Sequence, residues 1–165
     1  MTFDNLRVLL DYHYWARDRA LDAVEPLSPD QFTRDMGNSF RSIRDTLAHT
    51  YAAEWAWYSR WEGDSPTALL PPDMFPDVPA LRAAWAAQEV KTRAFLDALG
   101  DAGIDRTFDY KMMNGQPGAS VFWHMLQHVV NHATYHRGQV TTMLRQLGVE
   151  PPKSTDLISF YRIRQ

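Results

Sequence analysis

The segment from Ser120 to Leu147 constrains the fold more than any other part of this sequence. Its apolar residues recur at helical spacing, and Gly148 followed by prolines at 151 and 152 closes it. A helix over those 28 residues would span ~42 Å, which is longer than an average helix of a globular protein. The sequence therefore predicts a protein built around one long helix.

Three further segments have the same helical periodicity, and a short one follows near the end of the chain. Capping residues and glycines set their limits. We predict helices from Phe3 to Val24, from Ser39 or Ser42 to Glu62, from Pro79 to Leu99 with Gly100 as its C-terminal glycine, and from about Thr155 to Arg162.

The segments between these helices contain breaking and turn-forming residues. Gly63 to Pro79 holds five of the ten prolines and must be a loop. Apolar residues alternate from Phe108 to Met112 ahead of Asn114-Gly115, which predicts a short extended stretch and a tight turn. We therefore predict an all-α protein: a four-helix bundle of the up-down-down-up type with a long crossover loop and a short C-terminal helix, in which residues 1–165 form a single domain.

The composition excludes several classes of function. The formal net charge is −3 and no cluster of Lys and Arg occurs, so we expect no nucleic acid as partner. The absence of cysteine removes disulfides, thiolate metal sites and cysteine nucleophiles. No apolar run reaches the ~18 residues of a membrane-spanning helix, and the N-terminus has no signal-peptide core. We expect a cytoplasmic protein that does not associate with a membrane.

Four of the six histidines lie four residues apart within the long predicted helix, at His124, His128, His132 and His136. On a helical wheel, His136 and His132 lie about 30° and 70° from the centre of the apolar stripe, His128 about 110° and His124 about 150°. Two inward imidazoles one turn apart can reach one cation. The alternative is a pair of buried histidines that each hydrogen-bond to another group. A metal site would need a third ligand.

The sequence offers four candidates for that third ligand: His13, His49, Asp45 and Glu54. Glu54 lies near the middle of the apolar face of the second long helix. His49 lies on the other side of this helix among alanines, which allow a neighbouring helix to approach closely. The periodicity alone does not choose between them.

The run HVVNHATYHRGQVTTMLRQLG, followed by PPKSTDLISFYR, resembles the DinB-like family of small bundle proteins, named for DNA-damage induction. The similarity extends to YHYWARDRAL in the first helix and to LAHTYAAEWAWYSRW in the second. The resemblance implies one divalent metal ion per chain, held by His49, His132 and His136. It also allows a position near this site for His13.

The resemblance further implies a metal-dependent enzyme with a small-molecule substrate, and we expect the chain to form a homodimer. Three imidazoles leave a fourth position open, and zinc, nickel and iron all suit such ligands. Some relatives use a low-molecular-weight thiol, which suggests a thiol S-transferase or a related transferase or isomerase that acts on a small electrophile. The alternatives are a hydrolase that uses metal-bound water and a non-catalytic, stress-induced metal-binding homodimer.

Other side chains have expected roles around this site. Glu54 or Asp45 could orient the imidazole rings, or serve as a buried hydrogen-bonded carboxylate and a capping residue. Arg137 could bind a substrate carboxylate, but we favour a structural bridge to a loop carbonyl. Most of the six tryptophans should lie in the core, while some around Trp55, Trp57 and Trp61 could line a pocket or a dimer face.

Overall fold

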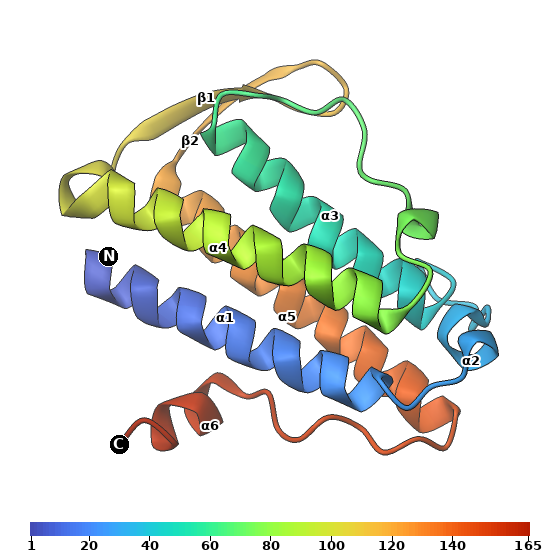
Figure 1. The fold of residues 1–165 in the computed structure, drawn as a ribbon. Coiled ribbons are helices and arrows are strands. Elements are labelled where there is room, and N and C mark those ends of the chain that lie inside the picture. Colours follow the sequence, from blue (N-terminus) through green and yellow to red (C-terminus); the bar gives the residue numbers. More distant parts are fainter.

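The computed structural model describes all 165 residues and is mainly helical, with one small sheet (Figure 1). In chain order the elements are α1 (Phe3–Val24), α2 (Pro29–Thr33), α3 (Ile43–Trp61), the 3-10 helix η1 (Pro72–Met74), α4 (Val78–Gly103), β1 (Thr107–Lys111), β2 (Pro117–Val121), α5 (Phe122–Gln146) and α6 (Leu157–Arg162). In Figure 1, α1 and α5 run in one direction, while α3 and α4 run in the other. The segment between α3 and α4 crosses the length of the molecule.

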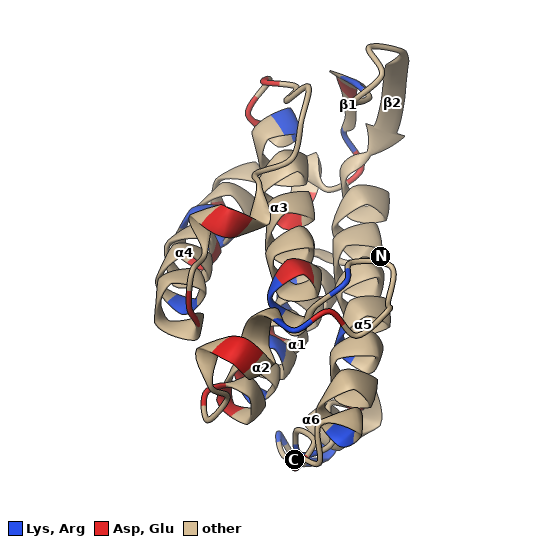
Figure 2. Cartoon of the chain, turned by 90° about the vertical axis from the view of Figure 1, so that its right-hand side faces the viewer, with Lys and Arg blue, Asp and Glu red and all other residues tan.

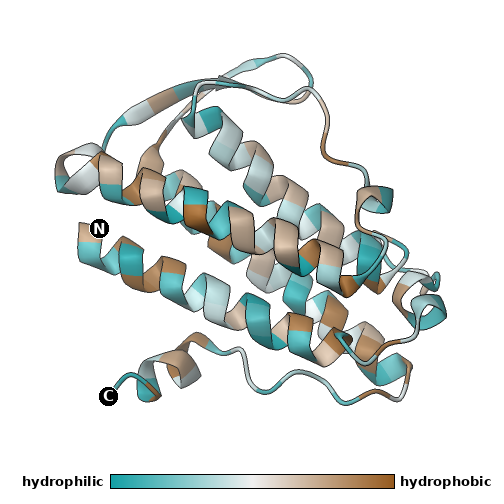
Figure 3. Ribbon diagram, in the orientation of Figure 1, coloured by the Kyte–Doolittle hydropathy of each residue, from teal (hydrophilic) through white to brown (hydrophobic).

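One apolar core joins the four long helices. α5 packs against α1 and α3, and α4 packs against the same two helices. Buried leucines from each long helix meet in this core: Leu6, Leu47, Leu81 and Leu144. Polar residues interrupt the apolar ones on every helix (Figure 3), and none of the helices is both long and apolar enough to cross a membrane.

The long helices begin at residues whose side chains accept hydrogen bonds from the first turn. Thr2 forms a reciprocal capping box with Asn5 at the start of α1, and the Ser42 hydroxyl accepts from the backbone N–H of Asp45 at the start of α3. Asp77 does the same for α4. These caps explain why the predicted limits of α1 and α3 agree closely with the structure.

The end of α4 and the start of α5 differ from the prediction. Gly100 has φ 63° and interrupts the helix, but one more helical turn follows it to Gly103. α5 begins at Phe122 and not at Ser120, because Ser120 pairs with Phe108 in the antiparallel hairpin of β1 and β2. The all-α prediction is therefore wrong in this respect: the expected extended stretch has a partner strand, and the two form a sheet.

Candidate metal centre

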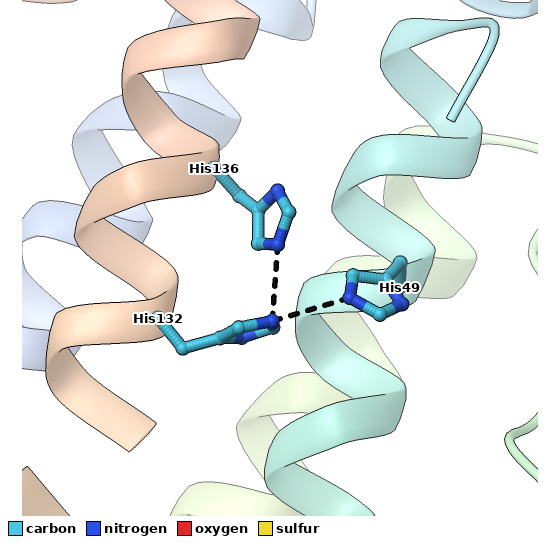
Figure 4. A group of neighbouring side chains, drawn as sticks. All are labelled: His49, His132 and His136. Carbon is cyan, nitrogen blue, oxygen red and sulfur yellow. Dashed lines mark hydrogen bonds between the residues drawn. The ribbon is translucent and has the colours of Figure 1, made fainter. Parts of the chain in front are cut away.

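Three histidine side chains meet between α3 and α5 (Figure 4). The Nε2 atom of His132 lies 3.2 Å from Nε2 of His49 and 3.0 Å from Nε2 of His136. One ring nitrogen of each histidine lies within 4.8 Å of the other two. Two imidazole nitrogens that bind one zinc ion tetrahedrally are ~3.4 Å apart, so this spacing is close to what a shared ion requires.

The helices bring these rings together for reasons visible in the sequence. His132 and His136 are one turn apart on α5 and project toward α3 (Figure 4). α3 and α5 form the most extensive contact between any two helices, and the alanines at 48 and 52 beside His49 are fully buried. The only charged residues of α5 are Arg137 and Arg145, and in Figure 2 this helix is almost free of charge.

The protonation of His136 is set by a neighbour one turn further along α5. Its Nδ1–H donates to Oε1 of Gln139 at 2.7 Å, which leaves the lone pair of a neutral ring on Nε2, the atom that faces His132. A partner of this kind fixes both the tautomer and the orientation of a metal-binding histidine. The neutral tautomer of His136 therefore presents a lone pair to the centre of the cluster.

Phe40 holds the ring of His49 from the loop before α3. The two rings stack at 3.9 Å between centroids with 18° between their planes, and Phe40 also meets the edge of His136 at 5.3 Å. Sequence reasoning missed both Phe40 and Gln139. The spacing of Gln139 from His136 is a signal that could have identified it, whereas nothing in the sequence placed Phe40 against His49.

Burial keeps the three imidazoles neutral. It lowers the pKa of His132 to about 3, with a further contribution from the neighbouring His136 and His49. Burial, and then the charge of His136, lowers the pKa of His49 to about 4. The pKa of His136 is also lowered by burial, although its hydrogen bond to Gln139 opposes this. Neutral imidazoles are the form that binds a metal ion.

These pKa shifts predict a pH dependence of stability. Without metal, the free energy of unfolding should fall as the pH drops from 7 to 5. Histidines of the unfolded chain take up protons around pH 6.5, whereas the pKa values of His132 and His49 in the folded chain are about 3 and about 4. The stability from these groups is complete above pH 6.5 and is lost toward the folded pKa values. Urea unfolding with a chelator present measures this, and His132→Asn should show a shallower decline. An equal decline in the variant would contradict the explanation.

Glu54 and Asp45 do not contact the rings of His49, His132 and His136, contrary to our expectation that one of them orients these rings. Glu54 is buried and accepts hydrogen bonds from Nε2–H of His13 at 2.9 Å, from the Tyr14 hydroxyl at 2.8 Å and from Nε1–H of Trp85 at 2.6 Å. Asp45 accepts from the guanidinium of Arg44 at 2.9 Å. His13 thus contacts Glu54, so three of the four candidates for the third ligand lie outside the cluster and His49 lies in it.

The remaining histidines of α5 lie away from the cluster centre. His124 is exposed beside Trp123. His128 is also exposed, and its ring centroid lies 5.9 Å from that of His132 and 5.4 Å from that of Trp57.

Arg137 has a structural position, although not the loop carbonyl that we expected. It is buried, and its Nη2 donates to Oγ1 of Thr134 at 2.7 Å and to the Tyr12 hydroxyl at 3.2 Å. The arginine therefore links α5 to α1. These contacts use the Nη2 group alone, and the buried Nε of Arg137 has no acceptor.

Comparison with known proteins finds a family whose model matches nearly the whole chain. A model of the DinB family matches residues 1–163 of the chain. The chain is also similar to "Protein DinB" of Bacillus subtilis (strain 168), with 24% identity over 150 residues, which cover 85% of this chain and 84% of that protein. The similarity thus extends over α1, α3 and α5 and includes the segments that carry the three histidines.

Proposed function

This chain belongs to the DinB family, and on that premise we propose that it binds one divalent metal ion through His49, His132 and His136. The observation that carries the proposal is the pair of short approaches to Nε2 of His132, at 3.0 and 3.2 Å. An imidazole nitrogen has either one hydrogen or one lone pair, so a single hydrogen bond satisfies it. A cation that accepts three lone pairs satisfies all three rings at once.

We propose that the scaffold is a four-helix bundle of the up-down-down-up type with a long crossover. Its support is the direction of the four long helices in Figure 1 and the core that they share. Two ligands on one helix and the third on a neighbouring helix give the site a rigid base. Such a base holds the ligands more firmly than flexible loops would.

We further propose that the chain is a metal-dependent thiol S-transferase or a related transferase or isomerase. The ion would supply Lewis acidity, which lowers the pKa of a coordinated thiol. Because the chain has no cysteine, the thiol must belong to a low-molecular-weight cosubstrate. In the reaction, the thiolate sulfur would form a bond to an electrophilic carbon of the substrate and displace the leaving group of that carbon, which departs with the electron pair of the broken bond, while the thiol proton passes to solvent. The net charge of −3 argues against nucleic acid as the partner, and we propose a small molecule as the substrate.

Cobalt(II) as a spectroscopic substitute tests this proposal. We expect one cobalt ion per chain, with visible absorption of a four-coordinate site, and a new sulfur-to-cobalt absorption band when N-acetylcysteine is added. Cobalt binding without a response to the thiol would favour a hydrolase, which an ester substrate would reveal, or a non-catalytic metal-binding dimer. Failure to bind cobalt, zinc or nickel would overturn the proposal.

A further inference from the structure

The structure has three buried arginines, and Arg60 alone among them has no polar partner. Arg17, Arg60 and Arg137 are 6%, 7% and 5% exposed. Arg17 donates to Glu89 at 2.7 Å and Arg137 donates to Thr134 at 2.7 Å. Arg60 takes part in none of the ion pairs of the structure, and its buried Nε has no hydrogen-bond acceptor.

An unpaired buried cation is costly, so a guanidinium in this position calls for an anion. The neighbours of Arg60 are aromatic faces. Its Cζ atom lies 4.5 Å from the ring centroid of Trp57 and 5.3 Å from that of Tyr110. These rings hold the guanidinium in place but accept no hydrogen bond from its N–H groups. Burial accordingly lowers the pKa of Arg60, although the nearby Tyr110 opposes this.

A cavity of about 490 Å³ adjoins this guanidinium, where the hairpin of β1 and β2 lies over the end of α3 (Figure 1). The cavity is within the range of sites that bind small molecules. Its lining is mostly apolar, and Arg60 is the only charged side chain in it. The lining residues are Trp57, Arg60, Tyr110, Met112, Met113 and Asn114.

We propose that this cavity binds a small organic carboxylate, with Arg60 paired to the carboxylate group and the apolar body of the ligand against Trp57, Tyr110 and the two methionines. A guanidinium presents parallel N–H donors whose spacing matches the two oxygens of a carboxylate. Aromatic and methionine side chains adapt to a flat or flexible apolar group. The pairing would supply the acceptor that Arg60 lacks within the protein.

The position of this cavity relates it to the histidine cluster. His49, Trp57 and Arg60 follow one another at intervals of eight and three residues on α3, which places them on the same side of the helix, with Arg60 ~16 Å along the axis from His49. Trp57 contacts His128, which in turn contacts His132. If the cavity binds the anionic end of the enzyme's substrate, the inference rests on the proposed function. The binding of a carboxylate by Arg60 does not depend on that function.

Calorimetric titration of the purified full-length chain with 3-phenylpropanoate tests the site, and 3-phenylpropanamide is the uncharged control. We expect the wild-type chain to bind the acid about tenfold or more tightly than the amide, because only the acid forms a charged hydrogen-bonded pair with Arg60. Arg60→Gln should bind the acid about tenfold or more weakly and should lose this discrimination. Arg60→Lys should retain part of it.

Three controls make the result specific. Arg34→Gln removes an exposed arginine that also has no ion pair, and it should bind like the wild type. The thermal unfolding of each variant shows whether it is folded. His136→Ala should keep the binding of the acid, which separates this site from any binding of the carboxylate to a metal ion.

The possible outcomes separate the two proposals. Binding of the acid that survives in His136→Ala supports the carboxylate site even if the chain proves not to bind metal. No binding by the wild type, equal affinity for acid and amide, or full binding by a folded Arg60→Gln variant would overturn the carboxylate site. None of these outcomes would contradict the proposed metal centre, because cobalt binding measures that centre independently.

Discussion

Replacement of His136 by alanine should lower the affinity of the chain for a divalent metal ion by more than about a hundredfold, since the loss of a group that only orients a ligand already costs about 10–100-fold. His136 is 4% exposed, and its Nε2 lies 3.0 Å from that of His132. Its removal would leave two imidazoles, too few for a closed set of protein ligands. Elemental analysis after dialysis, together with competition against a chelator, measures the effect.

Two matched variants give this prediction a graded scale. Gln139→Leu keeps the three histidines but removes the acceptor of the Nδ1–H of His136, so it should weaken metal binding by about 10–100-fold. His124→Ala removes an exposed histidine of the same helix and should leave metal binding unchanged. Retention of metal by His136→Ala, or its loss in His124→Ala, would contradict the assignment of ligands.

Replacement of Glu54 by alanine should lower the free energy of unfolding by about 3–5 kcal/mol, the range observed when one partner of a buried charged pair is removed. Three donors, from His13, Tyr14 and Trp85, point at its carboxylate from α1 and α4. Burial alone would raise the pKa of Glu54, but the charge of His13 and these hydrogen bonds outweigh it and hold the pKa below its ordinary value. The alanine variant would leave all three donors buried without an acceptor.

Urea unfolding at neutral pH measures this effect, with Glu62→Ala as the control. Glu62 lies just beyond the end of the same helix and is exposed, so its removal should change the free energy of unfolding by about 0.5 kcal/mol or less. Because Glu54 contacts none of the three clustered histidines, the folded fraction of Glu54→Ala should still bind metal. A loss of stability below about 1 kcal/mol would show that the network contributes little.

The sequence predicted the helices best where a local signal sets their ends. Thr2 and Ser42 are capping residues that act within one turn, and α1 and α3 begin directly after them. The hairpin was half predicted: alternation ahead of Asn114-Gly115 indicated the turn, but the strand after the turn contains Pro117, Gly118 and Ala119, which have little strand propensity. The second strand forms only because it pairs with β1, and this pairing cannot be read from its own residues. The sequence prediction therefore starts the long helix at Ser120, inside this strand.

The candidate site shows the same division between local and tertiary information. Helical periodicity selected His132 and His136, because the direction of a side chain on a helix follows from spacing alone. It could not choose between His49 and Glu54, since this choice depends on which helix packs on each side of α3. In the structure, His49 faces α5, while Glu54 contacts residues of α1 and α4. Only the resemblance to a family directed the choice to His49.

The separation of the three histidines along the chain has a consequence for folding. His49 lies 83 residues before His132, so an unfolded chain offers a metal ion only scattered or paired imidazoles. An ion bound at this centre would therefore favour the folded state by mass action, by about 2.7 kcal/mol at a free concentration one hundred times the dissociation constant. The melting temperature would then rise with the concentration of free metal. The fraction of the protein that is folded in a cell would then depend on the concentration of free metal ion in that cell.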